Sequence, residues 1–281
     1  MRIDLHTHSL ASDGTQSPAA VVSSAVEAGL DVVALTDHDT AKGWDEAAIA
    51  AQLRGIALVR GIEISCQHQG ISLHLLGYLL DPTAPGLLEE LDRSRSSRMT
   101  RAQRIVEKLS QDLPLHWEDV LEQVDPGATI GRPHIADALV AKGIAASRDG
   151  AFAEYLYGGS PYSASHYASD PVLAVRLVRE AGGVAVMAHP FASERGRVVD
   201  DSVIEAMAAA GMAGLEVHHR EHDGDGVRHG LDVAASLGLF VTGSSDYHGV
   251  GKSNQLGENT TDPLVLERIE DLATGVPVLR S

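Results

Sequence analysis

This 281-residue chain has almost no cysteine, and it lacks long apolar runs and an excess of basic charge. Cys66 is the only cysteine, which excludes an internal disulfide bond and fits a reducing, cytoplasmic compartment. No apolar run approaches the ~20 residues that cross a bilayer. The N-terminus also lacks a basic region followed by an apolar stretch, so we expect neither a membrane span nor a signal peptide.

The formal net charge of −17 restricts the classes of molecule that the chain is expected to bind. Such a charge argues against a broad, non-specific grip on duplex nucleic acid. It leaves room for a small phosphorylated substrate, because bound divalent cations would reverse the local sign. The oligomeric state stays open.

Short β-type runs alternate with amphipathic helical stretches through much of the chain, which predicts an α/β fold with parallel strands and helical crossovers. The first helix is expected to begin with Ser17 as its N-cap and Pro18 at its first position. The second is expected to end at Gly55. A barrel and a doubly wound sheet both fit this alternation. The strands are expected at 2–6, 31–39, 56–65, 71–78, 182–190, 214–219 and 237–248.

One connection is too short for a crossover helix, because only "CQHQG" (66–70) separates two strands. A hairpin fits instead. If its turn is centred on His68 and Gln69, Glu63 lies directly opposite His74. Their Cβ atoms would then be ~5 Å apart on one face, close enough to share an ion.

The strand rhythm stops between residues 81 and 165, where the pattern is mainly helical. We expect a barrel domain made of 1–80 and 166–281, with 81–165 as an inserted helical cap subdomain. This segment contains a basic island, "RSRSSRMTRAQR". Its arginines form either a solvated face paired with nearby acids or a rim that attracts phosphates. They are Arg93, Arg95, Arg98, Arg101 and Arg104.

Acid and imidazole side chains recur where the expected strands end, as in "HTH", "TDHD", "AHP" and "SDYH". In barrels, the loops after the strands build one active-site rim. A lone histidine in such a loop is usually a satisfied polar residue, but so many ligand types at one rim indicate a metal centre. Nitrogen and oxygen ligands without thiolate suit manganese, iron or zinc in a catalytic cluster. The candidate ligands are His6, His8, Asp13, His38, Glu63, His74, His189, Asp246 and His248.

These motifs together resemble the polymerase-and-histidinol-phosphatase (PHP) family of metal-dependent phosphoesterases. The resemblance is carried by "DLHTHSLASDG", "ALTDHD", "GIEIS", "HLLGY", "AHP" and "GSSDYHG", and "GRPHIADALV" is similar to a subgroup that acts on 3′,5′-bisphosphonucleotides and short oligoribonucleotides. It implies a distorted (β/α)7 TIM-like barrel. It also implies two or three divalent metal ions, with Mn²⁺ expected and Fe²⁺ or Zn²⁺ as alternatives.

The resemblance further implies a division of the ligands among three ions. The first would be held by His6, His8, Glu63 and Asp246. Glu63 would bridge to a second ion, completed by His74 and His189, and the third would be held by Asp13, His38 and His248. At the position of Asp13 other members carry histidine, which leaves the identity of the metal open.

Substrate-binding residues are expected in the cap subdomain and directly after its last residue. Arg132 and His134 flank Pro133 in "GRPHIA". Arg132 could grip a phosphate, and His134 could bind an oxygen or act as general acid. The alternative is that Arg132 pairs with Asp137. His166 is a further phosphate-binding candidate, carried by the subgroup resemblance. In "HHREHDGDG" we expect His218 to face the site, with His219 and His222 in a solvated loop.

The function expected from these features is hydrolysis of nucleotide phosphate esters by a metal-bridging hydroxide. The bond broken would hold the 3′-phosphate of a bisphosphonucleotide or the 5′-terminal nucleotide of a short RNA. The alternatives are a small-metabolite phosphatase acting on a substrate such as histidinol phosphate, a non-catalytic PHP module of a polymerase, and a regulatory metal-binding protein.

Overall fold

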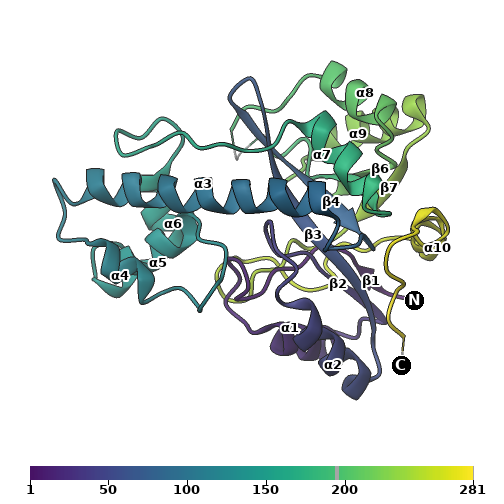
Figure 1. Cartoon of the computed structure of the whole chain (residues 1–281), viewed down its shortest axis with the longest axis horizontal. Helices are drawn as coiled ribbons and strands as arrows, with labels where there is room; N and C mark the ends of the chain where they lie inside the picture. Colours follow the sequence, from purple (N-terminus) through teal and green to yellow (C-terminus); the bar gives the residue numbers. More distant parts are fainter. Residues whose placement is uncertain (194–195, 281) are drawn as a thin grey trace.

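The computed structural model describes residues 1–193 and 196–280. Seven strands form one sheet in sequence order. Thr7, after the first strand, forms a parallel bridge with Tyr247, after the last, and His8 N donates to Tyr247 O over 2.8 Å. The sheet is therefore nearly closed into a barrel (Figure 1). The strands are β1 (Ile3–Asp4), β2 (Val32–Leu35), β3 (Ala57–His68), β4 (Ile71–Tyr78), β5 (Val184–Ala188), β6 (Gly214–His218) and β7 (Phe240–Gly243).

Strand β4 runs in the opposite direction to the other six strands of the sheet. Strands β1, β2 and β3 are parallel, as are β5, β6 and β7, whereas β4 is antiparallel to both of its neighbours. The expected α/β barrel with a single hairpin is confirmed. Parallel strands end at the same edge of a sheet, so the loops that follow them meet on one rim.

The hairpin register differs from the one expected. Its turn is Gln69–Gly70, one residue later than predicted, and both residues have positive φ, 47° and 79°. That is the geometry of a type I′ turn, whose second position favours glycine. Glu63 therefore lies opposite Leu76, not His74. Because the pairing moved by two residues, His74 keeps the predicted face, and its Nδ1 is 2.7 Å from Glu63 Oε1.

Helices cover the outside of the barrel, and their ends follow the capping residues of the sequence. Ser17 Oγ accepts a hydrogen bond from Ala20 N at the start of α1, and α2 ends at Gly55 with φ of 70°. Both predictions are confirmed. The barrel helices are α1 (Pro18–Glu27), α2 (Trp44–Arg54), α7 (Pro171–Glu180), α8 (Asp201–Ala209), α9 (Gly224–Leu237) and α10 (Pro263–Leu272).

The segment between β4 and β5 begins with a long helix, α3 (Pro85–Leu109), which extends away from the barrel (Figure 1). Its first half packs Leu87 and Leu91 into the barrel core, and its second half packs Ile105 and Leu109 into a separate apolar cluster. That cluster also contains side chains from α4 (Trp117–Leu121), α5 (Arg132–Ala141), α6 (Arg148–Ala151) and the π-helical turn η1 (Phe152–Leu156). Helix α3 thus joins two cores.

Alternation along the strands sorts the apolar residues to the two faces of the sheet. In β2, Val32 and Ala34 belong to one buried cluster, and Val33 and Leu35 to another. The helices α1, α2, α7 and α8 pack their apolar faces into the second cluster. Within the described part of the chain, no helix is both long and apolar enough to cross a membrane.

Candidate metal centre and phosphate-binding surface

The nine metal-ligand candidates lie together at the rim formed by the ends of the strands. Their nitrogen and oxygen atoms form overlapping groups in which all ligand atoms lie within 4.8 Å of one another. Three of these groups consist of predicted ligands only. They are His8–Asp13–His38–His248, His6–His8–Glu63–Asp246 and His38–Glu63–His74.

Glu63, on β3, lies at the centre of the cluster and is 1% exposed. Its Oε2 is 3.0 Å from His8 Nε2 and 3.2 Å from the nearest nitrogen of both His6 and His38. Its Oε1 is 2.7 Å from His74 Nδ1 and 3.2 Å from His189 Nε2. The two oxygens therefore face different sets of imidazoles, the arrangement that a carboxylate bridging two ions requires.

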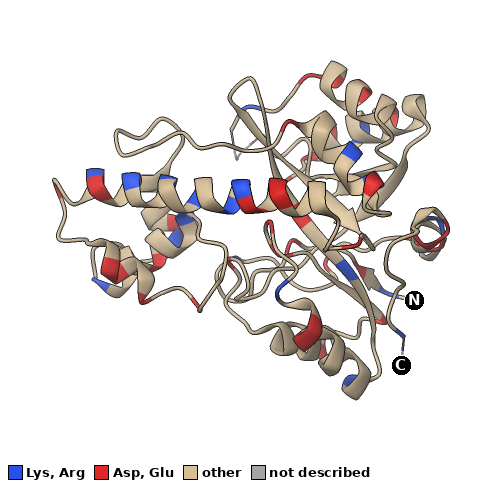
Figure 2. Ribbon diagram, viewed as in Figure 1, with Lys and Arg blue, Asp and Glu red and all other residues tan. Residues whose placement is uncertain are grey.

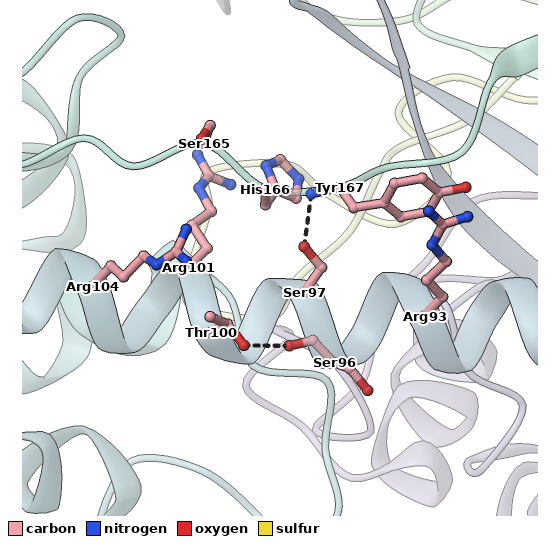
Figure 3. A pocket seen from close by; sticks show the side chains of 9 residues that line it. All are labelled: Arg93, Ser96, Ser97, Thr100, Arg101, Arg104, Ser165, His166 and Tyr167. Atoms are coloured by element: carbon pink, nitrogen blue, oxygen red, sulfur yellow. Dashed lines mark hydrogen bonds between the residues drawn. The ribbon is translucent and has the colours of Figure 1, made fainter.

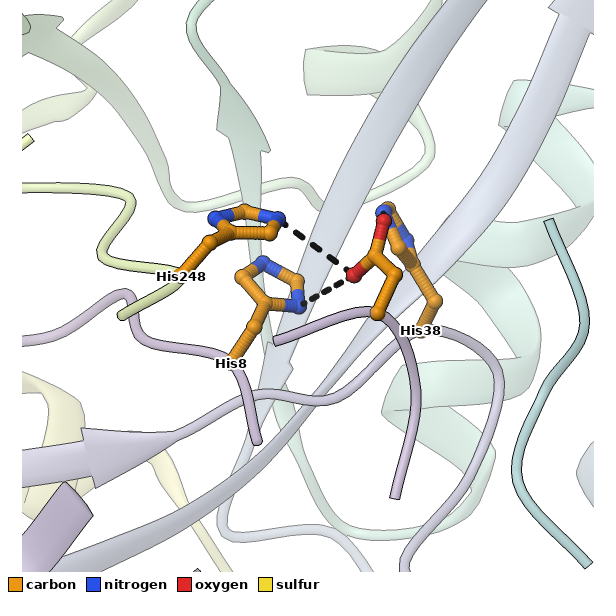
Figure 4. Close-up of side chains that lie close together, drawn as sticks. His8, His38 and His248 are labelled. Carbon is orange, nitrogen blue, oxygen red and sulfur yellow. Dashed lines mark ion pairs between the residues drawn. The ribbon is translucent and has the colours of Figure 1, made fainter. Parts of the chain in front are cut away.

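Asp13 lies among three histidines from three different loops, His8, His38 and His248. Figure 4 labels these three histidines. Asp13 Oδ1 is 3.3 Å from His248 Nε2 and 3.7 Å from His8 Nδ1, and its Oδ2 is 3.8 Å from His38 Nε2. The rings of His8 and His248 stack with centroids 4.1 Å apart. These donors converge from segments up to 240 residues apart.

Asp246 is the third predicted carboxylate of the cluster and lies near His6, His8 and His248. Its Oδ1 is 3.4 Å from Nε2 of both His6 and His8, and its Oδ2 is 2.9 Å from Lys252 Nζ. The backbone of Asp246 is left-handed, with φ of 54°, as is that of His189, with φ of 29°. A positive φ costs a non-glycine residue about 1–3 kcal/mol, and such residues gather at functional sites.

The electrostatics of the cluster suit cations. Burial alone would raise the pKa of the Glu63 carboxyl, but the imidazoles of His38, His74 and His6 hold it well below its ordinary value. Burial lowers the pKa of His8, yet Asp246 and Glu63 outweigh it and raise the pKa to about 9. Buried carboxylates need a positive partner. Without a metal, a protonated imidazole supplies that positive charge. A metal ion competes with the proton for the imidazole nitrogen.

The donor set also fits metal ions by geometry. His6 Nε2 and His8 Nε2 lie 3.1 Å apart and face each other. Two ligands at metal–nitrogen distances of about 2.1 Å and a tetrahedral angle are about 3.4 Å apart. Imidazole and carboxylate ligands without thiolate suit a first-row divalent ion. The residues present therefore fit the metal centre that the family implies.

Glu216 is a site residue that the sequence analysis missed. It lies on β6, is fully buried, and its Oε1 accepts from His6 Nδ1 over 2.9 Å and from Ser244 Oγ. Its Oε2 accepts from His189 N over 2.8 Å. It also forms a potential ligand group with His6 and His189. The available signal was an acid inside the apolar run "GLEVH" (214–218), because a buried charge in a strand needs a partner.

The histidines after β6 correct a second expectation. His218 is exposed, whereas His219 and His222 are buried, the reverse of the prediction. A β-bulge between Glu216 and His218 adds a residue to the strand and so shifts the alternation of faces. His219 consequently points inward, with Nε2 3.8 Å from Asp246 Oδ2, and Nε2 of His222 accepts from Phe191 N over 3.1 Å.

The basic island lies beside the metal cluster, and its arginines differ in their partners. Arg98 Nε is 3.0 Å from both Asp39 Oδ2 and Ser65 Oγ. Arg95 pairs with Asp92 and donates to Asp39 O over 2.6 Å. Arg101 donates only to the Ala164 carbonyl, over 3.2 Å. The solvated, acid-paired interpretation therefore fits Arg95 and fails for Arg101, which has no carboxylate partner among residues 1–193 and 196–280.

Arg132 is the second arginine of this kind. It does not pair with Asp137, which instead binds Arg148 through two contacts of 2.5 Å. Nη1 of Arg132 donates to Leu156 O over 3.1 Å, and the Arg132 guanidinium lies over the Phe152 ring. Burial, with Arg98 nearby, lowers the pKa of Arg132. Burial, with Arg132 and Arg98, lowers the pKa of Arg101 to about 9. Unbalanced positive charge at this place favours a bound anion.

The two histidine candidates near these arginines are neutral. Burial lowers the pKa of His134, and its Nδ1 accepts from Gly131 N over 3.1 Å, which leaves the proton on Nε2. Burial, with Arg101 and Arg98, lowers the pKa of His166 to about 3. His74, one of the candidate ligands, also lowers the pKa of His166, so the two imidazoles are close enough to interact electrostatically. His134 and His166 can each donate one hydrogen bond without carrying charge.

Known proteins share the sequence pattern and the fold of this chain. The PHP domain family matches residues 4–118. The chain is 33% identical over 261 residues to a 3′,5′-nucleoside bisphosphate phosphatase of Chromobacterium violaceum, covering 92% of each chain. It is 38% identical over 192 residues to a 5′-3′ exoribonuclease of Haemophilus influenzae, covering 68% of this chain and 69% of the relative. A solved structure from Bifidobacterium adolescentis, assigned as a metal-dependent phosphoesterase, superposes with a TM-score of 0.94 at 41% identity, covering 97% of this chain and 96% of that one.

Proposed function

The chain belongs to the PHP domain family and is a metal-dependent phosphoesterase, and from this we propose that it hydrolyses phosphate esters of nucleotides. The scissile bond would hold the 3′-phosphate of a 3′,5′-bisphosphonucleotide or the 5′-terminal nucleotide of a short oligoribonucleotide. Relatives named for these two activities support the proposal. The observation that carries it is an arginine pair, Arg101 and Arg132, that has no carboxylate partner among the described residues. The pair shares a pocket with Arg98, which contacts Ser65 and Asp39 beside the ligand cluster.

We assign the metal ligands as three sets, two of which share Glu63. Bound ions, with Mn²⁺ as the expected metal, would activate water and neutralise phosphoryl oxygens. Glu63 would bridge two sets, because its two oxygens face different imidazoles. The sets are His6, His8, Glu63 and Asp246; Glu63, His74 and His189; and Asp13, His38 and His248. The compact groups of ligand atoms differ from these sets at two residues. His189 Nε2 lies 3.2 Å from Glu63 Oε1, yet the compact group that contains His189 is completed by His6 and Glu216. His38 also belongs to a compact group with Glu63 and His74.

The protein's own side chains would bind and orient the substrate. Arg101 and Arg132 would hold a phosphate other than the one that is hydrolysed, since a guanidinium binds phosphate through paired hydrogen bonds. His134 and His166, neutral at physiological pH, would donate hydrogen bonds to phosphate oxygens. We therefore place His134 among the binding residues, and we do not assign it the general-acid role.

We also propose that residues 81–165 act as a cap subdomain over this site, since Arg132 and His134 come from α5. A cytoplasmic location fits the single, free and buried Cys66. Both proposals are consistent with a small phosphorylated nucleotide as the ligand.

Phosphate release from adenosine 3′,5′-bisphosphate by the Mn²⁺-loaded protein tests the proposed function. We expect inorganic phosphate and AMP as products, and Glu63→Gln should abolish turnover while the circular dichroism spectrum is unchanged. Glu205→Gln is the matched control, because Glu205 is exposed on α8. Turnover of histidinol phosphate without turnover of the bisphosphonucleotide would refute the nucleotide specificity. Near-normal turnover by Glu63→Gln would refute the site.

A further inference from the structure

A pocket of about 450 Å³ lies along α3 and is lined in part by Arg101, one of the two arginines of the proposed active site. It is formed between α3 and the segment that carries Ser165, His166 and Tyr167 (Figure 3). Tyr167 N donates to Ser97 Oγ over 2.7 Å and so fixes this segment against the helix. The pocket is open to solvent and is far larger than one phosphate group requires.

The charge of the pocket is of one sign. Arg93, Arg101 and Arg104 line it, and no aspartate or glutamate does. Neither Arg93 nor Arg104 forms an ion pair with a carboxylate in the part of the chain that the structure describes. Figure 2 shows basic residues recurring along α3 in a chain whose net charge is −17. A row of guanidinium groups without carboxylate partners gives an acidic protein a local positive potential, which attracts anions.

Arg101 links the pocket to the proposed active site. Arg101 lines both this pocket and a smaller one that also contains Arg98 and Arg132. Arg98 in turn contacts Ser65, which pairs with His74 across the β3–β4 ladder. Arg98 and Arg101 therefore connect the surroundings of the ligand cluster to the pocket on α3.

The length and chemistry of this row fit a chain of phosphates. Arg93 and Arg104 are eleven residues apart on one helix, so their Cα atoms are about 16 Å apart along its axis. At ~3.4 Å per stacked nucleotide, that length accommodates roughly three to five phosphates. Arg93 lies over the Tyr167 ring, its guanidinium carbon 3.6 Å from the centroid, and this flat pair can stack on a base. The Ser96 hydroxyl adds a hydrogen-bond donor, whereas the Thr100 hydroxyl donates to the Ser96 carbonyl over 3.0 Å.

We propose that the α3 pocket is the binding track for the downstream part of a single-stranded oligonucleotide whose 5′-terminal nucleotide lies at the metal cluster. This proposal rests on the proposed function and extends it. It names Arg93 and Arg104 as substrate-binding residues that act only when the substrate is longer than one nucleotide. A mononucleotide bisphosphate would not reach them.

Steady-state kinetics of the Mn²⁺-loaded enzyme test the proposal with two substrates, adenosine 3′,5′-bisphosphate and a 5′-phosphorylated tetra-adenylate. Arg104→Gln should raise KM for the tetranucleotide about tenfold and leave KM for the bisphosphonucleotide within twofold. The slope of log KM against log [KCl] for the tetranucleotide should fall by about 0.7, the value for one lost phosphate contact on a single strand. Arg54→Gln is the matched control, because Arg54 is exposed on α2 and pairs with Glu27, far from the α3 pocket in the sequence.

The outcomes separate the two proposals. If Arg104→Gln changes neither substrate, or changes both equally, the track is refuted while the proposed function stands. If its effect depends on the 5′-phosphate rather than on chain length, the row holds a terminal phosphate and the track is again refuted. If the wild-type enzyme hydrolyses neither nucleotide substrate, the proposed function itself fails. Arg93→Gln provides an independent variant at the other end of the row.

Discussion

Glu216 gives the sharpest test of how the metal centre is organised. This carboxylate accepts from three donors, His6 Nδ1, the His189 backbone amide and the Ser244 hydroxyl. Burial would raise its pKa, but His6 holds the pKa below its ordinary value, so it is ionised. Its bond to Nδ1 fixes the proton of His6 there and leaves Nε2 free to bind a metal.

Glu216→Gln keeps the shape of the side chain and removes both the charge and one acceptor. The serine hydroxyl can turn and accept, but the new amide NH₂ must face either His6 Nδ1 or the His189 N–H. One buried donor is then unpaired, which costs about 1–3 kcal/mol of unfolding free energy. Loss of such an orienting partner lowers metal affinity about 10–100-fold.

Isothermal titration of the metal-free protein with Mn²⁺ measures the affinity, and urea unfolding measures the stability. Glu205→Gln, on the exposed face of α8, removes the same charge without a buried partner and should match the wild type in both. If Glu216→Gln binds Mn²⁺ within twofold of the wild type, the orienting role is wrong, whatever its stability.

Two further predictions concern the cap. Arg132→Ala should raise KM for the bisphosphonucleotide about 10–100-fold with kcat nearly unchanged, and Arg132→Lys should recover only part, because an ammonium lacks the paired donors; an unchanged KM in phosphate-release assays would reject the phosphate role. Leu139→Ala, in the fully buried core of the cap, should cost about 2–5 kcal/mol. Hydrogen exchange should then accelerate in α5 and not in β3, and equal acceleration in both would contradict a separate cap.

Much of the barrel was predictable because its signals are local. The helix at Pro18 and the helix end at Gly55 are set by capping residues next to them. The short link "CQHQG" allowed only a hairpin, although the turn moved to Gln69–Gly70 because glycine suits its second position. The pairing between β3 and β4 differs from the predicted one by two residues, which keeps His74 on the same face as Glu63. The predicted contact between them is therefore present although the predicted register is wrong.

The sequence by itself determined which kinds of ligand recur after the strands, since every second side chain of a strand shares a face and parallel strands end on one rim. Only the tertiary structure decided the positions that depend on a partner strand. The bulge in β6 turns His219 inward and His218 outward, and a bulge is a property of the pairing with β7, not of β6 alone. In the same way, Arg101 and Arg132 are far apart in the chain, and only the packing of α3 against α5 brings their charges together.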